Sequence, residues 1–122
     1  MGVWRTPSVL TVGYGQVVVP ADVIEHAGRI LADAAASPAT VLVFGSHGRG
    51  DASDASDLDF LVIERDVANR AEEMVRLRDA LPLLGVPVDV IVVSQEQADK
   101  WARVKGTLVQ TALDEGRVVA ES

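Results

Sequence analysis

The segment that decides the fold is "VLVFGSHGRGDASDASDLDFLVI", which covers residues 41–63. It places a glycine-rich turn and a series of aspartates between two runs of apolar residues that favour β-strands. Apolar runs of this length, bounded by Gly, Asp and Ser, are typical of buried β-strands. The sequence therefore predicts a strand over "TVLVF", a turn that begins at Gly45-Ser46, and a second strand over "DLDFLVI".

Apolar residues at helical spacing predict helices on both sides of this segment. One helix is expected to start at Pro20, because proline is well suited to the first helical turn. A second is expected from about Asp66, with an apolar face made of Val67, Ala71, Met74, Leu77 and Leu81. These patterns predict helices that pack against the sheet.

The C-terminal part of the sequence predicts further strands and helices. The run "VPVDVIVV" predicts a third strand, and "RVVA" predicts a final edge strand. Between them, Ser94 and Gln97 form a capping-box pattern that predicts a helix through Trp101. Thr107 is expected to cap a last short helix. The predicted fold class is α/β (α+β), a small mixed β-sheet flanked by helices.

Length and composition limit the possible organisation and function. A chain of 122 residues fits a single domain, and we expect a β-hairpin extension over 1–19 followed by the main domain over 20–122. The net charge of −7 disfavours a surface that grips long nucleic acid. No apolar run reaches a membrane span, cysteine is absent and no signal peptide is evident, so we expect a cytoplasmic protein without a membrane partner.

Three aspartates are candidates for a metal site. Side chains alternate across a strand, so Asp57 and Asp59 are expected on the same face. Asp89 lies within an apolar strand, where an unpaired buried charge would be costly. If the two strands are neighbours, the carboxylates converge and can share Mg²⁺ ions that hold the phosphates of a nucleotide.

The glycine turn supplies groups that complement phosphates. Gly45 lacks a Cβ, so phosphates can approach its backbone closely. Ser46 adds a hydroxyl donor, and a short helix after the turn would direct backbone N–H groups at the anion. Arg49 either reaches a phosphate or pairs with Asp51 or Asp54 in the acidic loop. The loop residues around these two aspartates are expected to be solvated.

Other nucleotide-binding and calcium-binding motifs fail at specific positions. Asp51 stands where a P-loop requires lysine. Ser53 replaces the third glycine of a dinucleotide-binding turn. The "DLDFLV" stretch lacks the central glycine of an EF-hand.

The arrangement of Gly45-Ser46, ten residues, Asp57-x-Asp59 and a later Asp89 resembles the polymerase-beta-like nucleotidyltransferase superfamily. The chain is most similar to the minimal nucleotidyltransferases, and "PVDVIVV" and "GTLVQTALDEGRVV" extend the resemblance over nearly all of the sequence after Pro20. The resemblance implies that the Gly-Ser turn binds nucleotide phosphates. It also implies that the three aspartates hold two Mg²⁺ ions. ATP or another nucleoside triphosphate would be the donor. Gly48 and Ala120 depart from the commoner family residues without removing a catalytic group.

The resemblance also implies a protein partner. Minimal members often pair with a helical HEPN-type protein, as the antitoxin of a toxin–antitoxin pair. Three function classes remain open: transfer of AMP to a hydroxyl of this partner, for which we expect a tyrosine; neutralisation of the partner by binding alone; and modification of a small molecule such as an antibiotic. The acidic net charge predicts a basic partner surface.

Overall fold

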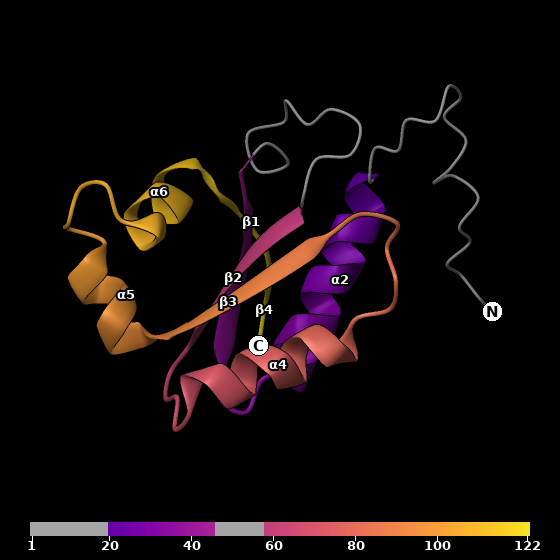
Figure 1. Ribbon diagram of the computed structural model, residues 1–122, viewed down its shortest axis with the longest axis horizontal. Helices are drawn as coiled ribbons and strands as arrows, with labels where there is room; N and C mark the ends of the chain where they lie inside the picture. Colours follow the sequence, from indigo (N-terminus) through magenta and orange to yellow (C-terminus); the bar gives the residue numbers. More distant parts are fainter. Residues whose placement is uncertain (1–19, 46–57) are drawn as a thin grey trace.

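The computed structural model describes residues 20–45 and 58–122, which form a four-stranded mixed sheet with helices on both faces (Figure 1). This confirms the predicted fold class. The hairpin expected over 1–19 and the turn residues 46–57 lie outside the described residues. The elements in chain order are α2 (Ala21–Ala34), β1 (Ala39–Phe44), β2 (Leu58–Glu64), α4 (Arg70–Ala80), β3 (Val88–Ser94), α5 (Gln95–Trp101), α6 (Leu108–Glu115) and β4 (Arg117–Glu121).

The strands lie in the order β3-β2-β1-β4. β1 is antiparallel to both β2 and β4, whereas β2 and β3 are parallel and are connected through α4. β4 is an edge strand, as the "RVVA" pattern predicted. The two strands around the glycine turn are therefore the two central strands of the sheet.

The two faces of the sheet carry different helices. α2 and α4 cover one face, and α5 and α6 lie against the other (Figure 1). Phe60 of β2 belongs to the larger core beneath α2 and α4, while Leu61 belongs to the smaller core beneath α5 and α6. Because side chains alternate along a strand, Asp59 lies on the same side as Leu61. The candidate carboxylate of β2 is thus on the α5–α6 side.

Helix α2 is the amphipathic helix that the sequence predicts. It begins directly after Pro20, and its apolar residues at helical spacing are buried in the larger core. The buried side chains on this face include Val23, Ile24, Ala27 and Leu31. The helix fixes one face of the sheet, because exposing these side chains would cost about 1.5–3 kcal/mol for each large one.

Helix α4 begins later than the sequence predicts. The expected start was near Asp66, but the helix starts at Arg70, and the side chain of Asn69 accepts a hydrogen bond from the backbone N–H of Glu72. The backbone of Asp66 is instead held by the hydroxyl of Ser37, which donates to its carbonyl at 3.0 Å and accepts from its N–H at 3.1 Å. Ala71 is exposed, so it does not belong to the apolar face as predicted.

The caps of α5 and α6 are confirmed. Ser94 and Gln97 form the predicted capping box at the start of α5. Thr107 accepts a hydrogen bond from the backbone N–H of Gln110 at 3.1 Å and so begins α6. Within the described part of the chain, no helix combines the length and the apolar character needed to cross a membrane.

Candidate active site

The parallel pairing of β2 with β3 brings two of the predicted site residues together. Asp59 and Asp89 are register partners across the two strands. At the start of the pairing, the N–H of Leu58 donates to the carbonyl of Pro87 at 2.9 Å, which fixes this register. Neighbouring strands are typically about 4.8 Å apart. The two carboxylates therefore stand side by side on the α5–α6 side of the sheet.

The glycine turn lies next to the same carboxylate. Phe44, the last residue of β1, is the register partner of Asp59, and Gly45 follows it with φ of 75°. A Cβ at Gly45 would lie only 2.9 Å from Oδ2 of Asp59. Both the positive φ and this close approach favour glycine. The Gly45 backbone and the Asp59 carboxylate are thus adjacent.

The exposure of Asp89 corrects one argument made from the sequence. The apolar residues around it suggested a buried charge, but Asp89 is exposed and Asp59 is half-buried. Asp89 is the second residue of an edge strand, where solvent reaches the side chain. Its carboxylate makes no hydrogen bond or ion pair with the described residues. The cost of burying a charge therefore gives no reason to expect a compensating group beside Asp89.

Three of the predicted site residues, Ser46, Arg49 and Asp57, lie outside the described residues. The described ranges contain no group of three or more His, Asp or Glu side chains that could hold a metal ion. The predicted carboxylate triad needs Asp57 in addition to Asp59 and Asp89. It therefore stays a prediction.

A second pair of carboxylates, which the sequence reasoning missed, lies at the other end of β2. Glu64 is fully buried and Glu73 of α4 nearly so. Glu73 accepts hydrogen bonds from Arg76 at 2.8 and 3.0 Å and from the backbone N–H of Ala36 at 3.0 Å. The hydroxyl of Ser37 lies 3.4 Å from Oε1 of Glu64. These groups form a buried polar network between β2 and α4.

A proton on Glu64 would complete this network. Oε2 of Glu64 is buried, and no group in the described ranges donates a hydrogen bond to it. Burial, followed by the hydrogen bond with Glu73 and its charge, raises the pKa of Glu64 from 4.5 to about 7. Burial also acts to raise the pKa of Glu73, but its hydrogen bonds with Glu64, Ala36 and Arg76 outweigh burial and lower it. A protonated Glu64 can donate to an ionised Glu73.

A signal for this network was present in the sequence. Glu64 directly continues the apolar run of β2, and Glu73 precedes Arg76 by three residues, which is the spacing of a helical ion pair. What the sequence did not show is that the two elements pack together at this point. That contact depends on the position of α4 against the sheet.

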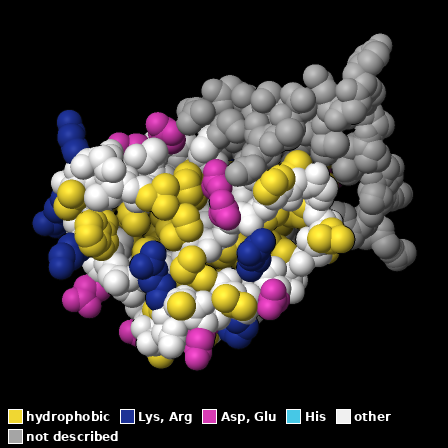
Figure 2. Space-filling view, viewed as in Figure 1, with side chains coloured by type: hydrophobic (Ala, Val, Ile, Leu, Met, Phe, Trp, Pro, Cys, Tyr) yellow, Lys and Arg dark blue, Asp and Glu magenta, His cyan; other side chains and the backbone are white. Residues whose placement is uncertain are grey.

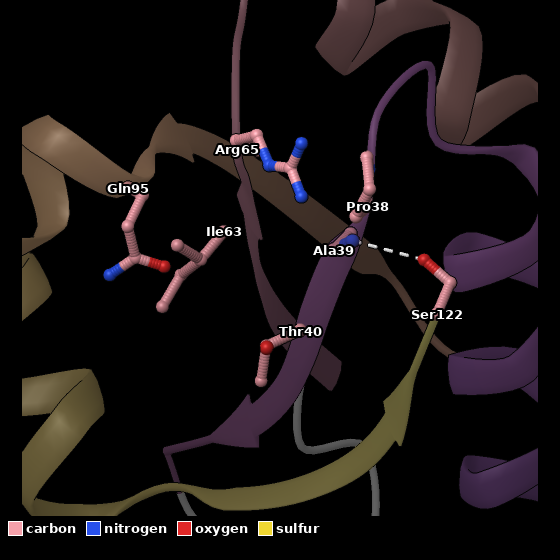
Figure 3. Close-up of a pocket in the computed structure, with 7 residues that line it drawn as sticks. All are labelled: Pro38, Ala39, Thr40, Ile63, Arg65, Gln95 and Ser122. Carbon is pink, nitrogen blue, oxygen red and sulfur yellow. Dashed lines mark hydrogen bonds between the residues drawn. The ribbon is translucent and has the colours of Figure 1, made fainter.

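A cavity of about 250 Å³ also lies away from the aspartates. Figure 3 shows its lining, which includes Thr40 of β1, Ile63 of β2 and Arg65. The hydroxyl of Ser122 at its margin accepts a hydrogen bond from the N–H of Ala39 at 3.0 Å. Ala39 pairs with Glu64, whereas Phe44 pairs with Asp59, so the cavity is at the opposite end of the sheet from the candidate site.

Comparison with known families gives a clear match. The model of the nucleotidyltransferase domain family matches residues 27–119, which span β1, the glycine turn, Asp59 and Asp89. The chain belongs to the nucleotidyltransferase domain family. This assignment supports a transferase of the nucleotidyl type. No curated protein is similar enough in sequence to count as a match.

Solved structures share the nucleotidyltransferase fold at low sequence identity. A toxin–antitoxin crystal structure with AMP-PNP is 22% identical with a TM-score of 0.54, and covers 80% of this chain and 73% of its own. A putative nucleotidyltransferase from Sulfolobus solfataricus is 23% identical with a TM-score of 0.54, and the match covers 80% of this chain and 76% of that one. A mutant of the toxin–antitoxin MntA-HpeT is 19% identical with a TM-score of 0.54, and the match covers 81% of this chain and 73% of that one. These similarities support the fold.

Proposed function

We propose that this nucleotidyltransferase domain transfers AMP, or another nucleoside monophosphate, from the corresponding triphosphate to a hydroxyl of a partner protein. The partner would be the toxin of a toxin–antitoxin pair, with this chain as its antitoxin. The observation that carries the proposal is the register of Asp59 with Asp89 next to the Gly45 backbone. Two carboxylates beside a glycine turn suit a metal-assisted reaction of phosphates.

The residues at this edge fit Mg²⁺. Carboxylate oxygens are the protein ligands that Mg²⁺ prefers. Asp59 and Asp89 provide two such groups on neighbouring strands, and Asp57 is expected to add a third and allow a two-metal site. Bound there, Mg²⁺ would offset the negative charge of the triphosphate and stabilise the charge that develops during transfer.

The chain's own groups have defined roles in the proposed reaction. The Gly45 backbone and Ser46 would contact the phosphates, and Arg49 would add a positive charge. The acceptor hydroxyl oxygen forms a bond to the α-phosphorus, the bond from that phosphorus to the β-phosphate oxygen breaks, and pyrophosphate leaves. The exposed carboxylate of Asp89 can accept the hydroxyl proton.

The structural neighbours support a nucleotide donor and a protein partner. One neighbour is a toxin–antitoxin with AMP-PNP, an ATP analogue. Another carries glutamates in place of two aspartates two positions apart, which is the spacing of Asp57 and Asp59. We further propose that the partner is a helical HEPN-type protein and that the acceptor is a tyrosine, which can enter an open site on the sheet edge.

The proposal is tested by incubating the chain with the protein encoded next to its gene, Mg²⁺ and ATP. Intact-protein mass spectrometry of the neighbour should show the addition of one or more AMP units. Asp59→Asn should abolish the addition because it removes a ligand charge without changing size. Asp79→Asn is the matched control, since Asp79 is an exposed carboxylate on α4, and it should leave the addition unchanged.

Two results would contradict the proposal. A stable complex whose neighbour never gains mass, with the wild-type chain and Asp59→Asn equally protective, would show neutralisation by binding alone. Unchanged melting temperature of the chain at saturating Mg²⁺ and ATP would contradict nucleotide binding, because a ligand of the folded state raises stability.

A further inference from the structure

The segment that joins α5 to α6 exposes a concentrated group of apolar side chains. The described residues include six exposed large hydrophobic side chains, and three of them fall within eight positions. Trp101, Val104 and Leu108 are 41%, 44% and 49% exposed, respectively. Single exposed apolar residues are normal on protein surfaces, whereas grouped ones mark interaction sites. This grouping therefore calls for a functional explanation.

Hydrogen bonds hold this segment in a defined shape. The N–H of Val104 donates to the carbonyl of Trp101 at 3.0 Å. The hydroxyl of Thr107 is 3.2 Å from the carbonyl of Trp101 and 2.9 Å from that of Val104. The same hydroxyl accepts from Gln110 in the first turn of α6. The apolar side chains are thus presented from an ordered backbone, which lowers the entropy cost of binding.

Cations are concentrated in the same segment. Lys100, Arg103 and Lys105 fall within six consecutive positions, 100–105, in a chain whose net charge is −7. None of the three makes an ion pair with a described residue, whereas Arg76 and Arg117 pair with glutamates. We call Trp101, Val104 and Leu108, together with Lys100, Arg103 and Lys105, the α5–α6 patch.

The patch belongs to the helices that cover the carboxylate side of the sheet. α5 and α6 pack over Leu61 and Val93, and Asp59 and Asp89 project on that same side. Figure 1 shows both helices on the side of the sheet opposite to α2 and α4. In Figure 2, Lys and Arg side chains gather at the edge of the molecule where α5 lies, beside exposed hydrophobic side chains. The patch therefore lies on the same side of the sheet as the two carboxylates.

We propose that the α5–α6 patch docks the acceptor protein through a surface that is apolar at its centre and acidic at its rim. The inference rests on the proposed function for the existence of a protein acceptor, but not on the transfer step. An acidic rim on the partner differs from the basic partner surface expected from net charge. The reason is that the local charge of the docking surface governs the contact.

Two other occupants fit the patch less well. Single-stranded nucleic acid would use Trp101 and the cations, but Val104 and Leu108 offer no aromatic face for bases, and the net charge of −7 repels a polyphosphate. A second copy of the chain would bring two molecules of charge −7 together. An acidic and apolar protein surface complements both features of the patch.

The test uses the fluorescence of Trp101 in the full-length chain. Trp4→Phe removes the other tryptophan of this chain, so that after subtraction of the partner's own spectrum the emission comes from Trp101. Titration at low salt with the protein encoded next to the chain's gene should shift the emission to shorter wavelength and saturate. Arg103→Glu combined with Lys105→Glu should weaken the dissociation constant about tenfold at low salt and less at high salt.

The matched control reverses two cations elsewhere. Arg65 and Arg78 are exposed and make no ion pair with described residues, and Arg65→Glu combined with Arg78→Glu should change the dissociation constant less than about twofold. Equal weakening by both double variants would overturn the proposal, because only net charge would then matter. Both variants spare the buried core, and circular dichroism should show an unchanged fold.

Other outcomes identify a different occupant or no occupant. The Trp101 emission could shift on adding a single-stranded oligonucleotide but not on adding the neighbouring protein. This result would overturn the proposal in favour of nucleic acid. A shift that depends only on the concentration of the chain would indicate self-association and would also overturn it. The two proposals can fail separately. Asp59→Asn should bind the neighbouring protein with unchanged affinity. Saturable binding without addition of mass to that protein would contradict only the transfer of AMP.

Discussion

The two ends of strand β2 carry carboxylate pairs with opposite environments. At one end Glu64 and Glu73 are buried, and donors from Arg76, Ser37 and the Ala36 backbone surround them. At the other end Asp59 is half-buried and its register partner Asp89 is exposed. Burial and the neighbouring Glu73 raise the pKa of Glu64 to about 7, so the buried pair is expected to hold a proton below that pH. In this second pair, the carboxylate of Asp89 is exposed to solvent.

This difference separates a structural carboxylate pair from a candidate catalytic one. In the buried pair, a guanidinium and backbone groups compensate the charge, and the network links β2 to α4. The pair of Asp59 and Asp89 lies beside Gly45 on the α5–α6 side of the sheet. Substitutions at Glu64 and Glu73 should therefore change stability, whereas substitutions at Asp59 should change activity.

The largest expected effect is on activity at Asp59. Asp59→Asn should lower the rate of nucleotidyl transfer by about a thousandfold or more, because charge stabilisation by the metal site depends on the carboxylate. Its thermal stability without metal should be unchanged or higher, since repulsion between carboxylates falls. Single-turnover kinetics and thermal melting measure the two effects. Loss of folding in this variant would show that the two carboxylate pairs do not differ as described.

The next effect is on stability at Glu73. Glu73→Gln removes the charge that binds Arg76 and should lower the free energy of unfolding by about 3 kcal/mol, near the low end for a buried ion pair. The low end applies because Arg76 is half exposed and can regain water. Urea denaturation measures the change. Glu72→Gln, which removes an exposed neighbouring carboxylate, should cost no more than about 0.5 kcal/mol.

The pH dependence of stability should reveal Glu64. A raised pKa in the folded state means that Glu64 contributes stability fully below its unfolded value of 4.5 and loses it as the pH rises through about 7. We compare the free energy of unfolding of Glu64→Gln with that of wild type at each pH. This difference should favour the variant by about 2 kcal/mol more at pH 8 than at pH 5. Urea denaturation at both pH values measures this difference. A constant difference would mean that Glu64 is ionised throughout and that the buried pair lacks its proton.

The smallest effect is expected at Gly45. Gly45→Ala should lower the free energy of unfolding by about 1 kcal/mol, because φ of 75° is unfavourable for alanine. The new Cβ should also displace the Asp59 carboxylate and reduce transfer. Gly106→Ala is a close control, since its φ is 86° and no heavy atom of residues 20–45 or 58–122 lies within 4 Å of the added Cβ. Equal transfer activity in the two variants would show that Gly45 has no role at the candidate site.

Sequence reasoning succeeded where the signal is local. Alternation and apolar runs located the strands, and the side chains of Ser94 and Thr107 marked the starts of α5 and α6. It failed at the start of α4, because Ser37, which is distant in sequence, holds the backbone of Asp66. It also misjudged the exposure of Asp89, which depends on β3 being an edge strand.

The sequence by itself determined the family and the types of residue at the candidate site. The motif from Gly45 to Asp59 and the later Asp89 indicated a nucleotidyltransferase, and the family match agrees. The tertiary structure decided the parallel register of Asp59 with Asp89, the burial of Glu64 against Glu73, and the exposure of the α5–α6 patch. The physical reason is that strand pairing and burial depend on contacts between residues far apart in the chain. Local patterns specify which groups are present, but packing decides which of them meet.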